Sequence, residues 1–377
     1  MTITSKNSEK TPSVPFIDLK AQQDKIRPQI EQAIMRVLDH GKYIMGPEVF
    51  ALEENLSEYC GAKYAISCSS GTDALLMVLM AKDVGRGDAI FLPSFTYTAT
   101  PEVVALLGAT PIFLDVLPDT FNINPDDISE GVKIAQAKGL KPKAIIAVDL
   151  FGQPAEYERL HKIAEKHNLW ILADAAQSFG ASSNNRKVGS LAFATATSFF
   201  PAKPLGCYGD GGAIFTDDSD LNEILKSIRV HGKGSSKYDN VRVGLNARLD
   251  TLQAAILLEK LKIFDEEIEE RQHIADKYNA ALEGTMNVPL ISRENKSAWA
   301  QYTIKVKPGM NRQAIVDRLQ SAGVPTMIYY EKPLHLQTAY KNYPTVKSLE
   351  ASETLSKTVL SLPMSPSLDF NDLLIGM

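Results

Sequence analysis

Short runs of consecutive apolar residues recur through the first two thirds of the chain, separated by stretches of mixed polarity. Runs of about four to eight residues that are apolar throughout are typical of strands buried on both faces of a sheet. The pattern predicts seven such strands: Tyr64–Ser67, Ala89–Leu92, Pro111–Asp115, Ala144–Asp149, Trp170–Asp174, Ala194–Phe200 and Gly212–Thr216.

Helical spacing, with apolar residues three and four positions apart, fills most of the intervals between these runs. The helices expected there are Asp73–Ala81, Thr100–Leu107, Pro125–Ala137 and Glu156–His167. Buried strands that alternate with helices favour a parallel sheet covered on both faces. The predicted fold class is therefore α/β, a three-layer domain with a mostly parallel seven-stranded sheet. Its last two strands have no helix between them, which predicts a hairpin at an edge.

Amphipathic helices are also expected outside the sheet-forming region. Two precede it, Ile26–Leu38 and Pro47–Tyr59, and each is followed by a glycine that suits a helix end. A third helix, Leu221–Val230, follows the last strand and leads into an exposed Gly/Ser-rich loop. A long amphipathic helix then begins at Leu249.

The character of the chain changes again near residue 265, where we place a hinge. Residues 14–265 are expected to form the large domain, and residues 266–377 a smaller C-terminal α+β domain with a strand near Tyr302–Lys307 and a helix at Arg312–Gln320. Residues 1–13 are polar and predict a flexible tail.

Composition narrows the class of protein. Hydrophobic residues make up 44% of the chain and charged residues 23%, which is typical of a globular protein. Lys+Arg 40 against Asp+Glu 45 gives a net charge of −5, which argues against a general binder of nucleic acid or of a membrane surface. No apolar run approaches the roughly 18 residues of a membrane span, and residues 1–13 do not resemble a secretory leader.

The cysteines and histidines bear on the cellular compartment and on metal binding. The three cysteines, Cys60, Cys68 and Cys207, have no metal-ligand spacing, and the six histidines form no metal-binding motif. We therefore expect no metal. An odd number of cysteines favours a reducing, cytoplasmic location, with the thiols in the core.

One lysine stands in an unusual setting. Lys203 lies between two prolines in Ser198–Gly212, a stretch that joins two predicted strands and contains four glycines in its second half. The ordinary explanation is a solvated lysine in a turn. The apolar and aromatic flanks favour a lysine held in a pocket, where desolvation and fixed orientation make its amine a nucleophile.

Polar and aromatic residues follow three other predicted strands, at the sheet edge where open α/β proteins bind ligands. Gly71 and Thr72 begin a helix after the first strand, which offers backbone N–H groups to a phosphate; plain helix capping is the alternative. Asp174 ends an apolar strand and needs a charged or donating partner, unless it caps the next helix. Tyr97 follows another strand and suits stacking on a flat cofactor, or core packing.

The combination favours one cofactor. Pyridoxal 5′-phosphate needs an anion site, a partner for its ring face, an acid at its pyridine nitrogen and a lysine amine. The successive strand ends offer all four in Gly71–Thr72, Tyr97, Asp174 and Lys203. Each residue alone has an ordinary explanation, but their order along the chain predicts a pyridoxal-phosphate site.

These residues lie in motifs that identify a family. The chain resembles the DegT/StrS sugar-nucleotide aminotransferases, pyridoxal-phosphate enzymes of fold type I, from about residue 15 to residue 366. The motifs that carry the resemblance are SCSSGTDAL (67–75), PSFTYTAT (93–100), LFGQPA (150–155), ADAAQSFGA (173–181), SFFPAKPLGCYGDGG (198–212) and RVGLNARLDTLQAAIL (242–257).

The resemblance implies roles for particular residues. As catalytic residues it implies Lys203, which would bind the cofactor and then move the proton, and Asp174, which would pair with the pyridine nitrogen. The remaining cofactor-binding residues that it implies are Gln177 near the ring hydroxyl, Tyr97 on the ring face, Gly71, Thr72 and Ser198 at the phosphate, and Asn246 from the neighbouring subunit of a homodimer with shared active sites. Lys203 itself disfavours the dehydratase branch of the family, in which a histidine replaces this lysine.

The wording of three segments, FIDLKAQQ (16–23), HGKYIMGPE (40–48) and FFPAKPLGCYGDGG (199–212), is most similar to the family members that act on UDP-2-acetamido-2-deoxy-3-oxo-glucuronate. L-glutamate would then be the amino donor, and the product a 3-amino sugar for bacterial surface polysaccharide such as O-antigen. Tyr329 and Tyr330 would lie near the sugar, with Tyr329 where a histidine is usual. Residues 371–377 are shorter than the usual final helix.

Arg229 is a further candidate for the substrate, because a guanidinium fork suits a carboxylate or a diphosphate. A surface ion pair is its alternative. Other reactions also stay open: amination of another UDP- or dTDP-linked 3-keto or 4-keto sugar, dehydration on the same cofactor, or a regulatory relative without turnover. The presence of Lys203, Asp174 and Asn246 together weighs against the last of these.

Overall fold

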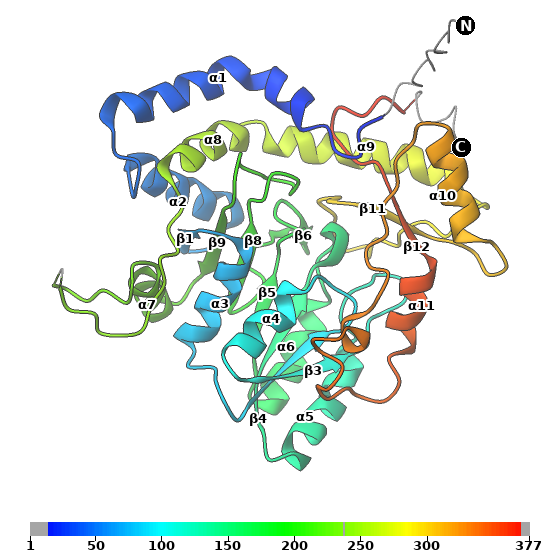
Figure 1. Cartoon of the computed structure of the whole chain (residues 1–377), viewed down its shortest axis with the longest axis horizontal. Coiled ribbons are helices and arrows are strands. Elements are labelled where there is room, and N and C mark those ends of the chain that lie inside the picture. Colours follow the sequence, from blue (N-terminus) through cyan, green and yellow to red (C-terminus); the bar gives the residue numbers. More distant parts are fainter. Residues whose placement is uncertain (1–13, 237, 371–377) are drawn as a thin grey trace, which may run out of the picture.

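A seven-stranded sheet lies at the centre of the computed structural model, which describes residues 14–236 and 238–370 (Figure 1). In spatial order its strands are β1 (Tyr64–Cys68), β9 (Gly212–Thr216), β8 (Ala194–Ser198), β5 (Trp170–Asp174), β4 (Lys141–Val148), β2 (Asp88–Pro93) and β3 (Thr110–Leu114). All seven predicted strands are confirmed. The tail predicted for residues 1–13 and the short C-terminus, residues 371–377, lie outside the described residues.

The pairing of the strands confirms a mostly parallel sheet. β5 is parallel to β4 and β8, and β2 is parallel to β3 and β4. β8 and β9 are antiparallel, as expected for two strands with no helix between them. The prediction that this hairpin forms an edge is wrong, because β1 pairs with the far side of β9, with Tyr64 opposite Thr216. That pairing joins segments about 150 residues apart, and no local pattern announces it.

Helices cover both faces of the sheet. Successive residues of a strand face opposite sides, and Ile214 and Phe215 of β9 accordingly belong to two different buried clusters. Ile214 shares its cluster with α3 (Gly71–Ala81), whereas Phe215 shares its cluster with α2 (Pro47–Cys60). The remaining sheet helices are α4 (Ala99–Leu106), α5 (Ile128–Ala137), α6 (Tyr157–His167) and α7 (Ser219–Arg229).

The first helix is longer than the sequence pattern predicted. α1 spans Leu19–His40 and lies along α8 (Thr251–Leu261) at the top of Figure 1. Its backbone leaves the helical region at Ile26, where the predicted helix begins. The nearly two turns before Ile26 are mostly polar, so no apolar spacing marked them, but Asp18 caps the helix by accepting a hydrogen bond from Ala21 N at 2.8 Å.

The C-terminal part has its own buried cluster, which runs from Ile274 to Phe370. α9 (Phe264–Leu282) connects the two parts, because Phe264 packs in a cluster of the first part and Ile274 in that of the second. A domain boundary near residue 265 therefore stays a prediction. The other elements here are β10 (Asn295–Lys296), β11 (Tyr302–Lys305), α10 (Arg312–Ser321), η3 (Leu334–Leu336), α11 (Glu350–Thr358) and β12 (Val359–Leu362).

Short elements complete the description. η1 (Pro125–Asp127) and η2 (Leu150–Gly152) are single 3₁₀ turns, and β6 (Ser182–Ser183) and β7 (Arg186–Lys187) form a small sheet with β10. Across residues 14–236 and 238–370, no helix combines the length and the apolar character needed to cross a membrane.

Candidate active site

Lys203 lies in a tightly folded connection between β8 and β9. Phe199 N donates to Gly211 O at 2.7 Å, Cys207 N donates to Phe199 O at 2.8 Å, and Lys203 N donates to Phe200 O at 2.8 Å. These bonds fold the proline-flanked stretch back on itself and fix the backbone that carries the lysine.

The Lys203 side chain is half-buried, and among the described residues its Nζ has no hydrogen-bond or ion-pair partner. Burial lowers the pKa of Lys203, and the nearby Asp174 carboxylate offsets part of that effect. A lysine that loses its proton more readily than usual is a better nucleophile. The structure therefore favours the pocket lysine over the solvated turn lysine.

Asp174 ends β5, next to the strand whose continuation carries Lys203. Its side chain is buried and accepts hydrogen bonds from Thr100 Oγ1 at 3.0 Å and from Ala176 N at 3.2 Å. Burial raises the pKa of Asp174, while these two donors and the charge of Lys203 lower it. A buried carboxylate with this environment is stabilised further by a cationic partner, such as a protonated ring nitrogen.

The N-terminus of α3 approaches the end of β8 closely. A Cβ atom added at Gly71 would lie 2.7 Å from Ser198 Cβ, so only glycine fits there. Ser70 caps the helix by accepting from Asp73 N at 3.0 Å, and within the described residues the N–H groups of Gly71 and Thr72 have no acceptor. Free N–H groups at a helix N-terminus, next to the Ser198 hydroxyl, suit a phosphate group.

Aromatic side chains line another side of the site. Tyr97 is 59% exposed, and its ring centroid lies 6.4 Å from that of Tyr330. Gln177 Nε2 donates to Tyr330 Oη at 3.4 Å, and Gln177 Oε1 accepts from Phe151 N at 2.6 Å. The predicted ring-face and ring-hydroxyl residues thus come together from separate strand ends, and Tyr330 joins them. Tyr329 is half-buried and packs against Phe16, with ring centroids 6.4 Å apart.

Arg229 has an environment that neither sequence hypothesis described. Its guanidinium is buried, pairs with Glu53, and donates to Ser67 O at 2.9 Å. The surface ion pair is wrong because the pair is buried. A guanidinium already paired with Glu53 is also poorly placed to bind substrate, so we no longer favour that role.

Asn246 is exposed, and its backbone forms an isolated antiparallel bridge with Val230. Its side chain has no partner among the described residues, as expected of a residue that serves a neighbouring subunit, and its predicted role stays a prediction.

Three contributors to the site were missed from the sequence. Thr100 donates a hydrogen bond to the Asp174 carboxylate. Phe151, whose φ is 59°, donates its backbone N–H to Gln177 Oε1. The third contributor is Asp149, which bonds the backbone of Asp174. Asp149 N donates to Asp174 O at 3.0 Å, and burial raises the pKa of the Asp149 carboxyl to about 7. An apolar strand that ends in an aspartate was a usable signal for Asp149.

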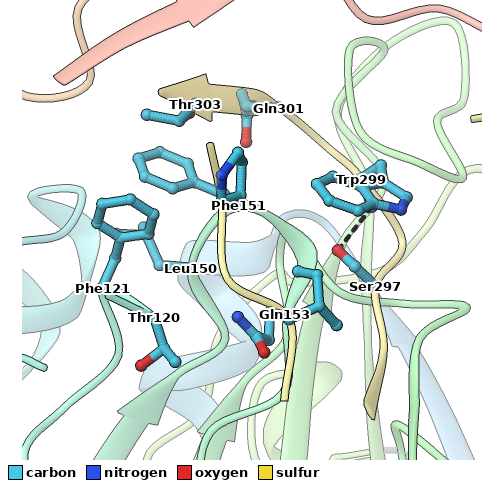
Figure 2. A pocket seen from close by; sticks show the side chains of 11 residues that line it. Thr120, Phe121, Leu150, Phe151, Gln153, Ser297, Trp299, Gln301 and Thr303 are labelled. Atoms are coloured by element: carbon cyan, nitrogen blue, oxygen red, sulfur yellow. Dashed lines mark hydrogen bonds between the residues drawn. The ribbon is translucent and has the colours of Figure 1, made fainter. Parts of the chain in front are cut away.

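A small cavity lies behind Phe151, between η2 and the segment that leads into β11 (Figure 2). It has room for about one water molecule, which is too little for a substrate. The buried Thr120 Oγ1 and Gln301 Oε1 beside it have no hydrogen-bond partner within residues 14–236 and 238–370. Its lining consists of Thr120, Phe121, Leu150, Phe151, Gln153, Pro289, Ile291, Ser297, Trp299, Gln301 and Thr303. Across the described residues, no group of His, Cys, Asp and Glu could hold a metal ion.

Comparison with known proteins agrees with this geometry. Residues 24–374 match the model of the DegT/DnrJ/EryC1/StrS aminotransferase family. The chain belongs to this family. The UDP-2-acetamido-2-deoxy-3-oxo-D-glucuronate aminotransferase of Pseudomonas aeruginosa is 46% identical over 94% of this chain and 96% of its own. A protein of Geobacillus stearothermophilus named as a pleiotropic regulatory protein is 38% identical over 94% of both chains.

Solved structures match the fold over nearly all of this chain. A DegT/DnrJ/EryC1/StrS aminotransferase from Brucella abortus has a TM-score of 0.94 and 50% identity, covering 96% of this chain and 97% of its own. A Bacillus subtilis protein solved with bound cofactor PMP has a TM-score of 0.88 and 31% identity, covering 98% of this chain and 85% of its own. This DegT-family member is therefore a pyridoxal-phosphate-dependent aminotransferase of fold type I, as its sequence predicted.

The residues present fit the cofactor. Four features are those that this group requires: the close approach of Gly71 to Ser198, the α3 N–H groups that have no acceptor in the described part of the chain, the buried Asp174, and the nearby Lys203 amine, which has no partner there either.

Proposed function

We propose that this protein transfers the amino group of L-glutamate to a keto sugar nucleotide, UDP-2-acetamido-2-deoxy-3-oxo-glucuronate, to give a 3-amino sugar. The proposal rests on the Lys203–Asp174 arrangement in a chain that is 46% identical to an enzyme named for that substrate. The product would serve surface polysaccharide synthesis, such as that of O-antigen, in the cytoplasm. Nucleic acid and membrane have no part in this function.

Each site residue has a distinct task in the proposal. Bound pyridoxal phosphate supplies an electron sink for the carbon that loses its proton. Lys203 Nζ would hold the cofactor and, once released from it, would take the proton from the substrate carbon and deliver it to the cofactor carbon, a transfer that its lowered pKa favours. Asp174 keeps a proton on the ring nitrogen through its buried negative charge. Gly71, Thr72 and Ser198 would hold the phosphate.

The other residues orient the ring. Tyr97 would cover one ring face, and Gln177, fixed by Phe151 N, would present its amide to the ring hydroxyl. Tyr330 lies against both and would limit the space for the sugar, together with Tyr329. Two substrates use this one site in turn, so Tyr330 would contact whichever of them is bound.

The active unit in this proposal is a homodimer, with Asn246 reaching the phosphate of the neighbouring subunit. Asn246 is exposed, and the segment before it presents Val241 and Val243, which are 53% and 82% exposed. A subunit contact would cover such exposed apolar side chains, together with an amide that has no partner among the residues that the structure describes. Inactive Lys203→Ala and Asn246→Ala chains, mixed and refolded together, should recover activity in hybrid dimers. No recovery would contradict the shared site.

A different keto sugar is the second candidate. A transaminase of Aneurinibacillus thermoaerophilus named for dTDP-3-amino-3,6-dideoxy-alpha-D-galactopyranose is 38% identical over 94% of this chain and 94% of its own. That likeness supports a 3-keto sugar in both cases but leaves a dTDP-linked substrate as the rival.

A substrate panel tests the proposal. The protein would be incubated with L-glutamate and single UDP- or dTDP-linked 3-keto or 4-keto sugars, and released 2-oxoglutarate measured. We expect release with UDP-2-acetamido-2-deoxy-3-oxo-glucuronate and none with Lys203→Ala. Faster release with a dTDP-linked sugar would favour the second candidate. If glutamate does not bleach the visible absorbance of the lysine-bound cofactor, glutamate is not the donor.

A further inference from the structure

The side chain of Tyr97 makes few contacts that would fix its orientation. Its side chain is 59% exposed, and among the described residues its one ring neighbour is Tyr330, 6.4 Å away. The direction of the ring therefore depends on the backbone of the loop that carries it. We call this loop, Ser94–Thr98, the platform loop; it connects β2 to α4.

The first residue of the platform loop is fixed by a segment about 240 residues further along the chain. Ser94 is fully buried, and its carbonyl accepts from Leu334 N at 2.8 Å. Its Oγ lies 2.6 Å from His335 Nδ1 and 3.3 Å from His335 N. We call Leu334–Tyr340 the clasp, since it begins with η3 and holds the platform loop.

Hydrogen-bond chemistry fixes the roles in this contact. The backbone His335 N–H donates to Ser94 Oγ, so the hydroxyl proton of Ser94 is free to point at His335 Nδ1. Nδ1 then accepts, and the imidazole carries its proton on Nε2, which lies 3.4 Å from Glu353 Oε1. The arrangement resembles a nucleophilic triad in composition only, because Ser94 is fully buried and no substrate can reach it.

The last residue of the platform loop is fixed by the other end of the clasp. Thr98 Oγ1 lies 2.6 Å from Tyr340 Oη. Tyr340 is itself buried, with its ring edge-on to Phe113 of β3 and ring centroids 6.3 Å apart. Both ends of the platform loop are therefore bonded to the clasp, and Tyr97 lies between these two contacts.

We propose that His335 and Tyr340 are positioning residues for the cofactor site, which hold the platform loop so that the Tyr97 ring faces the cofactor. The inference rests on the proposed role of Tyr97. If the clasp served only to dock the C-terminal segment on the sheet, the loss of these contacts would affect folding stability but not cofactor affinity. Each residue supplies a part-buried contact to a hydroxyl of the platform loop. Loss of His335 Nδ1 leaves the Ser94 hydroxyl proton without this acceptor, and loss of Tyr340 Oη leaves Thr98 Oγ1 without this partner.

The test measures the dissociation constant of pyridoxal phosphate for the full-length protein, from the absorbance of the lysine-bound cofactor. His335→Leu and Tyr340→Phe should each raise that constant at least about fivefold, the effect of one lost hydrogen bond. His335→Asn should restore most of the affinity, because its side-chain oxygen can replace Nδ1 as acceptor. Tyr340→Phe keeps the ring, so it serves if His335→Leu does not fold.

Two pairs of the same chemistry provide controls. His167 Nε2 lies 2.8 Å from Ser129 Oγ, near the start of β5 and therefore at the end of that strand away from Asp174. Tyr302 Oη donates to Asn279 Oδ1 at 2.6 Å in the C-terminal cluster. His167→Leu and Tyr302→Phe should leave the dissociation constant within about twofold.

A double variant separates positioning from other effects. If His335 acts through Tyr97, then His335→Leu should weaken binding much less in a Tyr97→Ala background than in the wild type. Equal weakening in both backgrounds, or unchanged affinity with a lower melting temperature in His335→Leu and Tyr340→Phe, would overturn the proposal. If Tyr97→Ala alone leaves the constant unchanged, the proposed role of Tyr97 fails as well.

Discussion

The buried carboxyl of Asp149 gives the sharpest prediction from the surroundings of the site. Asp149 is fully buried; its Oδ1 accepts from Ala155 N and Tyr157 Oη and its Oδ2 from Ser178 Oγ, all at 2.8 Å. Burial is the largest cause that raises its pKa from 3.8 to about 7, and the charge of Asp174 adds to it, while the three donors lower it.

The sign and size of the effect on stability follow from linkage. Between pH 4 and 7 the folded chain keeps a proton on Asp149 that the unfolded chain has lost. The free energy of unfolding therefore falls as pH rises through this interval, and changes no further above it. A shift of about 3 pKa units, at 1.36 kcal/mol per unit, corresponds to a loss of ~4 kcal/mol.

Asp149→Asn removes this titration and keeps the shape of the side chain. Its Oδ1 can still accept from Ala155 N and Tyr157 Oη, and its amide can donate to Ser178 Oγ. The difference in unfolding free energy, variant minus wild type, should rise by ~4 kcal/mol between pH 4 and 8. Denaturant unfolding of both cofactor-free proteins at several pH values measures this difference.

Asp265 provides a control of opposite sign. Burial raises the pKa of its carboxyl, but Lys187 and Tyr59, which donate hydrogen bonds to it, together lower the pKa by more than burial raises it, so the net shift is downward. The ionised Asp265 carboxylate therefore stabilises the folded chain above about pH 4, and this stabilisation is lost as pH falls. Compared with the wild type, Asp265→Asn should become less stable as pH rises. If the Asp149→Asn difference is flat from pH 4 to 8, the reasoning about Asp149 is refuted.

Three further variants test buried features of the fold. Burial lowers the pKa of Lys260 from 10.5 to about 8, so between these pH values the unfolded chain keeps a proton that the folded chain has lost. The unfolding free energy of the wild type, relative to Lys260→Met, should therefore rise by ~3 kcal/mol from pH 8 to 10.5. An unchanged difference would contradict this. Gly71→Ala places a Cβ 2.7 Å from Ser198 Cβ and should cost ~1–3 kcal/mol in melting experiments and weaken cofactor binding. Arg229→Met removes the cation beside the largely buried Glu53 carboxylate, to which Ser67 N and Ser67 Oγ still donate. This should cost ~3–5 kcal/mol, with no change in the KM for the sugar in molecules that fold.

Local pattern was enough to predict the seven strands, and it also suggested four positions for a cofactor. The predicted strands are mainly apolar, and the positions suggested for the cofactor, Gly71–Thr72, Tyr97, Asp174 and Lys203, lie at or after the ends of predicted strands. Lys203 and Asp174 could be proposed because each is a charged residue in an apolar setting, which needs an explanation.

Contacts between distant segments could not be predicted in the same way. Arg229 meets Glu53 across 176 positions, and the clasp meets Ser94 across 241. Neither partner changes the local hydrophobic period, so nothing in either segment points to the other. The kinked start of α1 was missed for a different reason, since its residues before Ile26 are polar and show no apolar spacing.

The identity of the lysine that binds the cofactor is the most direct test of the account. The loaded protein would be reduced with borohydride, digested, and the peptide that carries the cofactor mass identified. We predict modification at Lys203 alone and no modification in Lys203→Ala. Modification of another lysine, above all the buried Lys260 with its lowered pKa, would contradict the account.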